Sequence, residues 1–170
     1  MTPAYRIEIN ASEAARAMMV SEDDFVREMQ DGRVASRFVE LWAETLFGVT
    51  KHSNTNHKSS DAADTTDGGD TIEYAIRTLT KGGIKFQDSK FIGAGRSCDL
   101  SDLKNSIRRS DKWLVFDIRF FPVVTAYKLR CAVLETWIDA GELKPSGLSS
   151  KKFCDLLNRD SVPMTRELEF

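Results

Sequence analysis

The chain has 170 residues, of which 41% are hydrophobic and 29% are charged, and its formal net charge is −2. This length and composition are typical of one soluble globular domain, and they exclude a wholly disordered chain, a collagen and a coiled coil. No apolar run approaches the roughly 18 residues that would predict a membrane span. The three cysteines show no CxxC spacing, so we expect reduced thiols in a cytoplasmic protein.

The small net charge conceals an uneven distribution of charge along the chain. Residues 1–72 carry a net −6, residues 73–131 a net +6, and residues 132–170 a net −2. A basic middle third in an acidic protein is typical of a surface that binds a polyanion. The alternative is that these lysines and arginines are scattered over a solvated face.

The first 50 residues are predicted to be helical. Asn10 with Glu13 predicts the start of a helix over 11–20, and Ser21 predicts the start of a second helix that ends at Asp31-Gly32. Over 33–47 apolar side chains recur at helical spacing, with Gly48 as the stop: Val34, Phe38, Leu41, Trp42 and Leu46.

Residues 49–70 form a long polar stretch, which indicates a loop with a functional role. The hydrophobic period then changes to two, so 72–79 is predicted to be a strand. Asp67-Gly68-Gly69 is a hairpin-type turn, and 61–66 should pair antiparallel with that strand.

Residues 80–98 carry four glycines and are predicted to form an excursion with short extended pieces. Asp99 should cap a helix that ends near Arg109. Strands are expected over 112–119 and 123–129, joined by a tight turn at Pro122. A helix should follow from 131 to Gly141, and a last helix should begin at Ser149 or Ser150. The tail beyond Pro163 is expected to be loosely held.

The predicted fold class is therefore α/β in the α+β sense, with a mixed sheet flanked by helices. We expect a single domain over 1–170, made of a helical segment (1–48), a core (49–160) and a tail (161–170). Trp42, Trp113 and Trp137 lie on apolar faces and should belong to the core.

One arrangement of residues has a recognisable chemistry. Metal-dependent cleavage of a phosphodiester needs carboxylates to hold Mg²⁺ and a cation near the attacked phosphate. A strand places residues two apart on the same face. Glu73, Ala75 and Arg77 therefore share a face, and Asp61 or Asp64 on the neighbouring strand would reach it.

The stretches Asp61-Ala62-Ala63-Asp64 and Glu73-Tyr74-Ala75-Ile76-Arg77 resemble the signature of the PD-(D/E)xK nucleases, in the PvuII-like branch of the type II restriction endonucleases. In that branch a polar excursion and a helix follow the motif, and then two strands and another helix. Residues 80–140 are predicted to have the same order, so about 80 residues match in organisation. The resemblance implies a restriction-endonuclease-like core.

The sequence departs from the motif at two positions. Ala75 stands where the second acid is expected, and Arg77 stands where the lysine is expected. Arginine can place a positive charge beside a phosphate, but alanine cannot bind a metal ion. Three explanations remain open: an engineered inactive variant, a substitute carboxylate from Glu73 or Glu44, and a chance match without catalysis.

The resemblance implies Mg²⁺-dependent, sequence-specific cleavage of double-stranded DNA by a homodimer, in which residues 1–48 could form the dimer contact. Asp61 would bind the metal, with Asp64 as a substitute and position 75 as the second ligand in an active form, and Arg77 would stabilise charge on the phosphate. The glycine-rich excursion carries side chains suited to reading base edges: Lys85, Gln87, Ser89, Lys90 and Arg96. Other basic residues would hold phosphates: Lys81, Lys104, Arg108 and Arg109.

The alternative function is a non-catalytic module that binds DNA or another protein. The missing acid and the missing lysine favour it. The paired motif and the order of elements that follows favour the nuclease.

Overall fold

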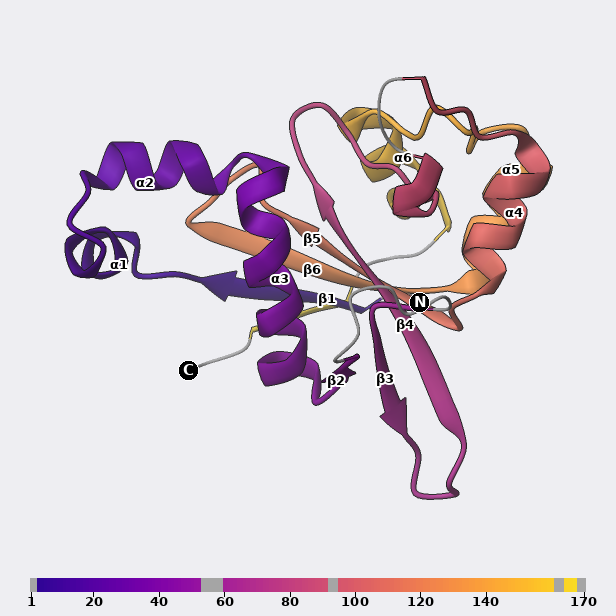
Figure 1. Cartoon of the computed structure of the whole chain (residues 1–170), viewed down its shortest axis with the longest axis horizontal. Coiled ribbons are helices and arrows are strands. Elements are labelled where there is room, and N and C mark those ends of the chain that lie inside the picture. The colour runs from indigo at the N-terminus through magenta and orange to yellow at the C-terminus, as the bar shows by residue number, and fades with distance from the viewer. Residues whose placement is uncertain (1–2, 53–59, 92–94, 161–163, 168–170) are drawn as a thin grey trace.

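A computed structural model describes residues 3–52, 60–91, 95–160 and 164–167. Within these residues one mixed sheet has the strand order β2-β3-β4-β5-β6-β1-β7. Figure 1 shows α1, α2 and α3 gathered on one side of the molecule and α4, α5 and α6 on the other. The predicted fold class, a mixed sheet flanked by helices, is confirmed.

The strands are β1 (Pro3–Glu8), β2 (Thr50–Lys51), β3 (Ala62–Thr65), β4 (Thr71–Leu79), β5 (Lys112–Asp117), β6 (Val123–Arg130) and β7 (Met164–Glu167). The helices are α1 (Ala11–Ala17), α2 (Glu22–Met29), α3 (Gly32–Phe47), α4 (Leu100–Arg108), α5 (Cys131–Asp139) and α6 (Ser150–Asp160), and a short 3-10 helix, η1, spans Ser89–Phe91.

The predicted helix starts are confirmed by their capping contacts. The Asn10 side chain accepts a hydrogen bond from the Glu13 N–H, and the Ser21 side chain accepts one from the Asp24 N–H. Asp99 and Asp102 form a complete capping box at the start of α4. These contacts satisfy backbone donors that have no partner within the helix.

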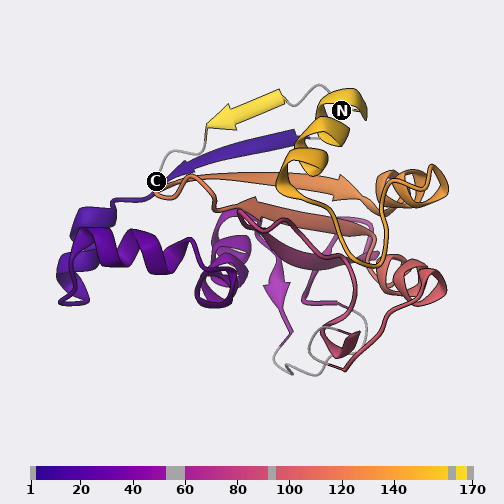
Figure 2. The ribbon, with the colours of Figure 1, turned by 90° about the horizontal axis from the view of Figure 1, so that it is seen from above.

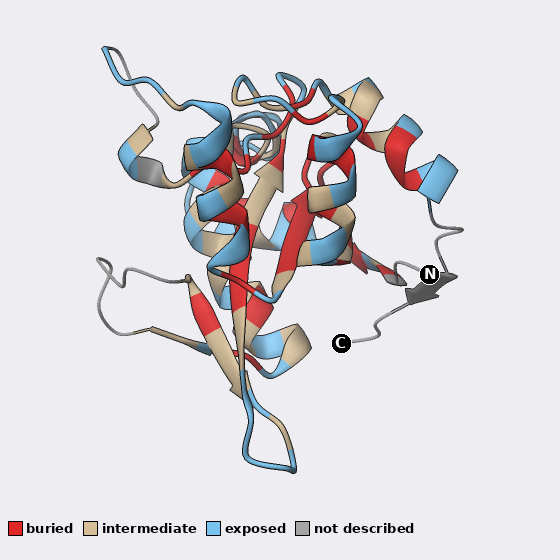
Figure 3. Cartoon of the chain, turned by 90° about the vertical axis from the view of Figure 1, so that its right-hand side faces the viewer, coloured by how far each residue is buried: buried red, intermediate tan, exposed pale blue. Residues whose placement is uncertain are grey.

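The strand pairs expected from the sequence are also present. The hairpin turn after β3 is closed by a hydrogen bond of 2.9 Å from the Thr66 N–H to the Asp70 carbonyl, and Gly69 adopts a φ of 85°. β4 runs parallel to β5, with α4 as the crossover, and β5 runs antiparallel to β6. The β3–β4 hairpin projects from the body of the molecule (Figures 1 and 3).

The sheet separates two hydrophobic clusters. The first contains side chains of α1, α2 and α3 together with Tyr74, Ile76 and Leu114. The second contains side chains of α4, α5 and α6 together with Ala75, Trp113 and Val115. The buried residues follow the sheet through the centre of Figure 3. Trp113 and Trp137 are buried as predicted, whereas Trp42 is only half-buried and packs against the first cluster.

Two predictions at the ends of the chain were wrong. Residues 3–8 form β1 and are not helical, and Met164–Glu167 form β7 and not a loose tail. β1 pairs antiparallel with β6 and parallel with β7, as the strands side by side in Figure 2 show. These pairings join residues far apart in the sequence, so the pairing partners cannot be inferred from a local pattern.

No helix among the described residues is long and apolar enough to cross a membrane.

Candidate functional site

The carboxylate of Asp61 lies beside the middle of β4. The Asp61 N–H donates to the Tyr74 carbonyl at 2.9 Å, just before β3 begins. Asp61 Oδ2 accepts from the Ile76 N–H at 2.8 Å and from Arg77 Nη1 at 2.7 Å. The structure therefore brings Asp61, residue 75 and Arg77 together, as the motif predicts.

Arg77 is held by several groups at once. Besides its ion pair with Asp61, its Nη1 donates to the Ile76 carbonyl at 2.7 Å. Its guanidinium carbon lies 5.2 Å from the centroid of the Trp113 ring, which is a favourable position for a cation over an aromatic face. The side chain nevertheless retains 22% of its exposure, and that of Asp61 retains 35%. A fixed but accessible cation can meet an incoming phosphate without much reorganisation.

Asp64 lies on the opposite face of the sheet from Asp61. It pairs with Ile72 across the hairpin, and Ile72 packs against the first cluster. Directly opposed residues of two strands share a face, so Asp64 is on the side away from Arg77. Asp61 is therefore the carboxylate that accompanies Arg77.

Ala75 is buried, with 4% exposure, among the apolar side chains of the second cluster. Glu73 shares its face, and its carboxylate contacts His52 Nε2 at 3.1 Å and accepts a hydrogen bond from the Ser60 hydroxyl. The other suggested substitute, Glu44, accepts from the Lys51 N–H at 2.8 Å. Both acids are thus engaged by neighbours of their own.

His52 and Ser60 were not singled out from the sequence. His52 follows β2 and donates its backbone N–H to the Asp61 carbonyl at 3.2 Å. The contact of His52 and Ser60 with Glu73 depends on how β2, β3 and β4 pair, and no residue spacing encodes that arrangement.

The residues present do not form a site with two carboxylates for Mg²⁺. Among the residues the structure describes, no group of three histidine, cysteine, aspartate or glutamate side chains is placed to hold a metal ion. Position 75 offers no side-chain oxygen, and Asp61 Oδ2 already accepts two hydrogen bonds. Mg²⁺ needs oxygen ligands in near-octahedral geometry, so the second ligand is missing at position 75.

The residues expected to hold phosphates have partners within the protein. Lys104 Nζ lies 2.9 Å from Asp139 Oδ1, and Arg108 Nε lies 2.6 Å from Glu135 Oε1. The side chain of Arg109 pairs with Asp88, and Lys81 Nζ donates to Gln30 Oε1 at 3.2 Å. Much of the basic charge in the middle third is therefore neutralised by acids, including acids of α5.

The residues expected to read base edges differ in exposure. Lys85 is exposed and forms no ion pair with a described residue, and Lys90 and Arg96 are also exposed. Gln87 is buried, with 5% exposure, and its amide donates to the Phe91 carbonyl at 3.4 Å. The Gln87 side chain is thus turned into the protein. The side chain of Ser89 lies outside the described residues.

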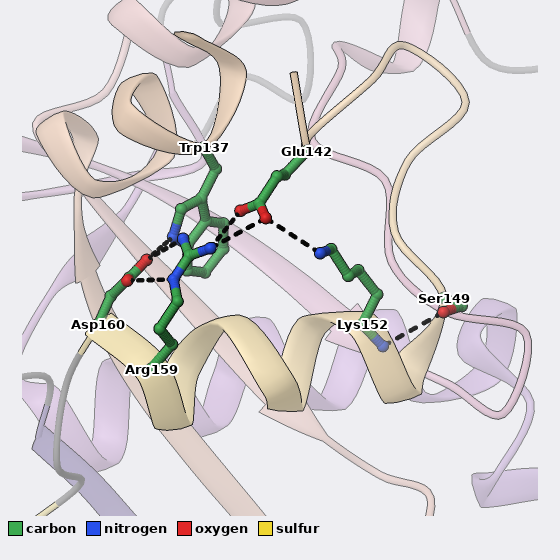
Figure 4. Close-up of polar contacts among 6 residues, drawn as sticks. All are labelled: Trp137, Glu142, Ser149, Lys152, Arg159 and Asp160. Carbon is green, nitrogen blue, oxygen red and sulfur yellow. Dashed lines mark hydrogen bonds and ion pairs between the residues drawn. The ribbon is translucent and has the colours of Figure 1, made fainter. Parts of the chain in front are cut away.

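Two further polar networks border the second cluster. Arg119 holds the buried Asp117 through two hydrogen bonds, at 2.8 and 2.7 Å. Figure 4 shows the other, in which Glu142 accepts from Lys152 and Arg159, while Asp160 binds Arg159 and Trp137 Nε1. The hydrogen bond from Lys152 lowers the pKa of Glu142, and the hydrogen bond from Arg159 lowers that of Asp160. This network ties α6 to the end of α5.

Comparisons of the chain with protein-family models, with curated proteins and with solved structures found no match. The function is therefore inferred from the geometry of the site.

Proposed function

We propose that the chain is a DNA-binding protein of the restriction-endonuclease class, whose phosphodiester site consists of Asp61, residue 75 and Arg77. The observation that carries this proposal is the 2.7 Å contact between Asp61 Oδ2 and Arg77 Nη1 alongside residue 75. The order of elements after the motif supports it, because the excursion, α4, β5, β6 and α5 follow in the sequence expected of that class.

In this proposal Arg77 binds the phosphate, and Asp61 fixes the direction of its guanidinium. The cation over Trp113 neutralises charge on the phosphate. An acid at position 75 would place a second carboxylate beside Asp61, and Mg²⁺ bound there would supply a Lewis acid and an activated water. With Ala75 the chain binds DNA and does not cut it efficiently.

The partner is double-stranded DNA in the cytoplasm, gripped by a homodimer with one site for each strand. Lys85 and Arg96 are exposed in the excursion, the segment that would approach a base edge in the major groove. Sequence specificity would come from this segment.

The second candidate function is a binding module without catalysis. Two observations favour it: Ala75 packs among apolar side chains, and Asp61 Oδ2 satisfies the Ile76 N–H at a point where β3 no longer pairs with β4. In that case the role of Asp61 is to accept the hydrogen bond from the Ile76 backbone N–H.

Duplex binding tests the proposal. We expect a gel-shift titration at about 50 mM salt to show binding that weakens steeply as salt is added. The Arg77→Gln variant should lower the salt slope by about 1, as expected for the loss of one phosphate contact. The matched control is Lys151→Gln, an exposed lysine on α6, which should bind as the wild type does.

Circular dichroism of each variant separates loss of binding from loss of fold. Absence of duplex binding by the folded wild-type protein would overturn the proposed function and leave the protein-interaction module. Equal slopes for Arg77→Gln and Lys151→Gln would remove Arg77 from the phosphate site.

A further inference from the structure

Three basic side chains gather where β5 begins and β6 ends. Lys112 is the first residue of β5, and Arg130, the last residue of β6, is its direct partner across the antiparallel pair. Lys128 lies two residues before Arg130 and pairs with Leu114. Residues two apart on a strand share a face, so all three side chains project from the same face of the sheet.

These three cations have no acidic partner among the residues that the structure describes. None of the three makes an ion pair within 4.0 Å with a carboxylate of the part of the chain that the structure describes. Most of the other basic side chains of the middle third do have such partners, for example Lys104 with Asp139 and Arg108 with Glu135. Like charges directly opposite each other on two strands are destabilising.

The ring of Tyr74 lies beneath the two lysines. Lys112 Nζ is 5.7 Å and Lys128 Nζ is 5.2 Å from the centroid of this ring. Tyr74 is buried, with 1% exposure, and burial raises the pKa of its hydroxyl. Asp64 lies on the same face and also raises the pKa of this hydroxyl through its charge, and it forms no ion pair with either lysine. Both ammonium groups therefore lie within cation–π distance of one aromatic ring, and both lysines are half-buried.

We propose that Lys112, Lys128 and Arg130 form a phosphate-binding site, and that its natural ligand is a phosphodiester of bound nucleic acid. The choice of nucleic acid rests on the proposed function, whereas the affinity for phosphate rests on three cations that have no ion-pair partner among the described residues. Arginine binds phosphate oxygens in a bidentate manner, and the two lysines add point charges on the same side.

The site lies close to the candidate phosphodiester site along the strands. Lys112 is aligned with Tyr74 in the parallel β4–β5 pair, so it is one step from Ala75. It occupies the opposite face of the sheet from Arg77, at the end from which the β3–β4 hairpin projects (Figure 1). The two sites are thus a few residues apart along the strands and lie on opposite faces of the sheet.

The first arm of the test uses inorganic pyrophosphate on the full chain. At constant ionic strength, low-millimolar pyrophosphate should raise the melting temperature of the wild type, because it binds the folded protein. The double variant Lys112→Gln/Lys128→Gln should lose this increase. The matched double variant Lys144→Gln/Lys151→Gln removes the same charge at two exposed lysines elsewhere and should keep it.

The second arm measures duplex binding as a function of salt. The Lys112→Gln/Lys128→Gln variant should lower the salt slope by about 2, because each lost phosphate contact removes about 0.9. If the double variant fails to fold, both measurements are made on Arg130→Gln, which changes an exposed residue. Its salt slope should fall by about 1.

The outcomes separate the two proposals. A pyrophosphate effect in the wild type that survives in both site variants would overturn the site. A pyrophosphate effect lost in the site variants, with unchanged duplex slopes, would overturn the nucleic-acid ligand in favour of free phosphate compounds. A further outcome is loss of the pyrophosphate effect in the site variants while neither the wild type nor any variant binds duplex DNA. That result would support the phosphate site and overturn the proposed function.

Discussion

Two aspartate–arginine ion pairs, Asp117–Arg119 and Asp61–Arg77, differ in burial and in the number of hydrogen bonds between the partners. Asp117 and Arg119 form a bidentate pair in which Asp117 is almost fully buried, and Arg119 also lies 3.2 Å from Cys154 Sγ. Asp61 and Arg77 share a single contact of 2.7 Å, and both side chains remain partly accessible. Both pairs border the second hydrophobic cluster.

The difference lies in how much bonding capacity remains. The Asp117–Arg119 pair uses both carboxylate oxygens, and the Asp117 side chain is only 4% exposed, so this carboxylate has little capacity left for a ligand. In the Asp61–Arg77 pair only one carboxylate oxygen and one terminal nitrogen are engaged with each other, which leaves capacity for a ligand. The proposed phosphate contact of Arg77 rests on this unused bonding capacity.

The largest expected effect comes from breaking the Asp117–Arg119 pair. Asp117→Asn should lower the free energy of unfolding by about 3 kcal/mol, because the guanidinium of Arg119 loses its charge partner in a buried place. Asp61→Asn should lower it by less than about 1 kcal/mol, since the pair is accessible and asparagine can still accept from the Ile76 N–H. Urea unfolding of the two variants measures the contrast. Equal losses would show that Asp61 is as structural as Asp117.

A smaller effect is expected from the network at the end of α5. The pKa values of Glu142 and Asp160 are lowered in the folded protein, chiefly by Lys152 for the first and by Arg159 for the second. A carboxylate whose folded pKa is depressed adds stability above its ordinary pKa, and this is lost as the pH falls through the folded value.

Thermal unfolding should therefore show a decline in melting temperature between about pH 5 and about pH 3. Glu142→Gln should lower the melting temperature at neutral pH and flatten this decline. Glu22→Gln, at the exposed start of α2, should follow the wild-type curve. A decline of the same size in Glu142→Gln and the wild type would assign the acid sensitivity to other groups.

Local signals in the sequence predicted most of the fold. The apolar period of 33–47, the Asp67-Gly68-Gly69 turn and the nearly continuous apolar run of β5 each act over a few residues, and each structure formed as predicted. β1 and β7 were missed because they are stabilised by partners at the other end of the chain. The alternation of Tyr5, Ile7 and Ile9 with polar residues was the signal available for β1.

The site was predictable only in part. The motif indicated Asp61 and Arg77, and only the strand register could exclude Asp64 from their side of the sheet. The roles of His52 and Ser60 also depend on register. The sequence showed the net positive charge of residues 73–131. The number of charges could not show that Lys104 and Arg108 form ion pairs with α5 whereas Lys112 and Lys128 do not.

The central claim is that residue 75 occupies the second acidic position of a phosphodiester-cleaving site. The Ala75→Glu variant tests it most directly, with a long and varied DNA substrate that contains many sequences. Because position 75 is buried, circular dichroism must first show that the variant folds, and a gel shift must show that it binds DNA.

We predict that folded Ala75→Glu cleaves both strands with Mg²⁺, and that the isosteric Ala75→Gln does not. Ala75→Glu combined with Asp61→Ala should lose cleavage, because one carboxylate of the pair is gone. Ca²⁺ should support binding without cleavage, since it prefers longer and looser coordination. If folded, DNA-binding Ala75→Glu leaves the substrate intact with Mg²⁺ and with Mn²⁺, residue 75 is not a catalytic position and the protein is a binding module.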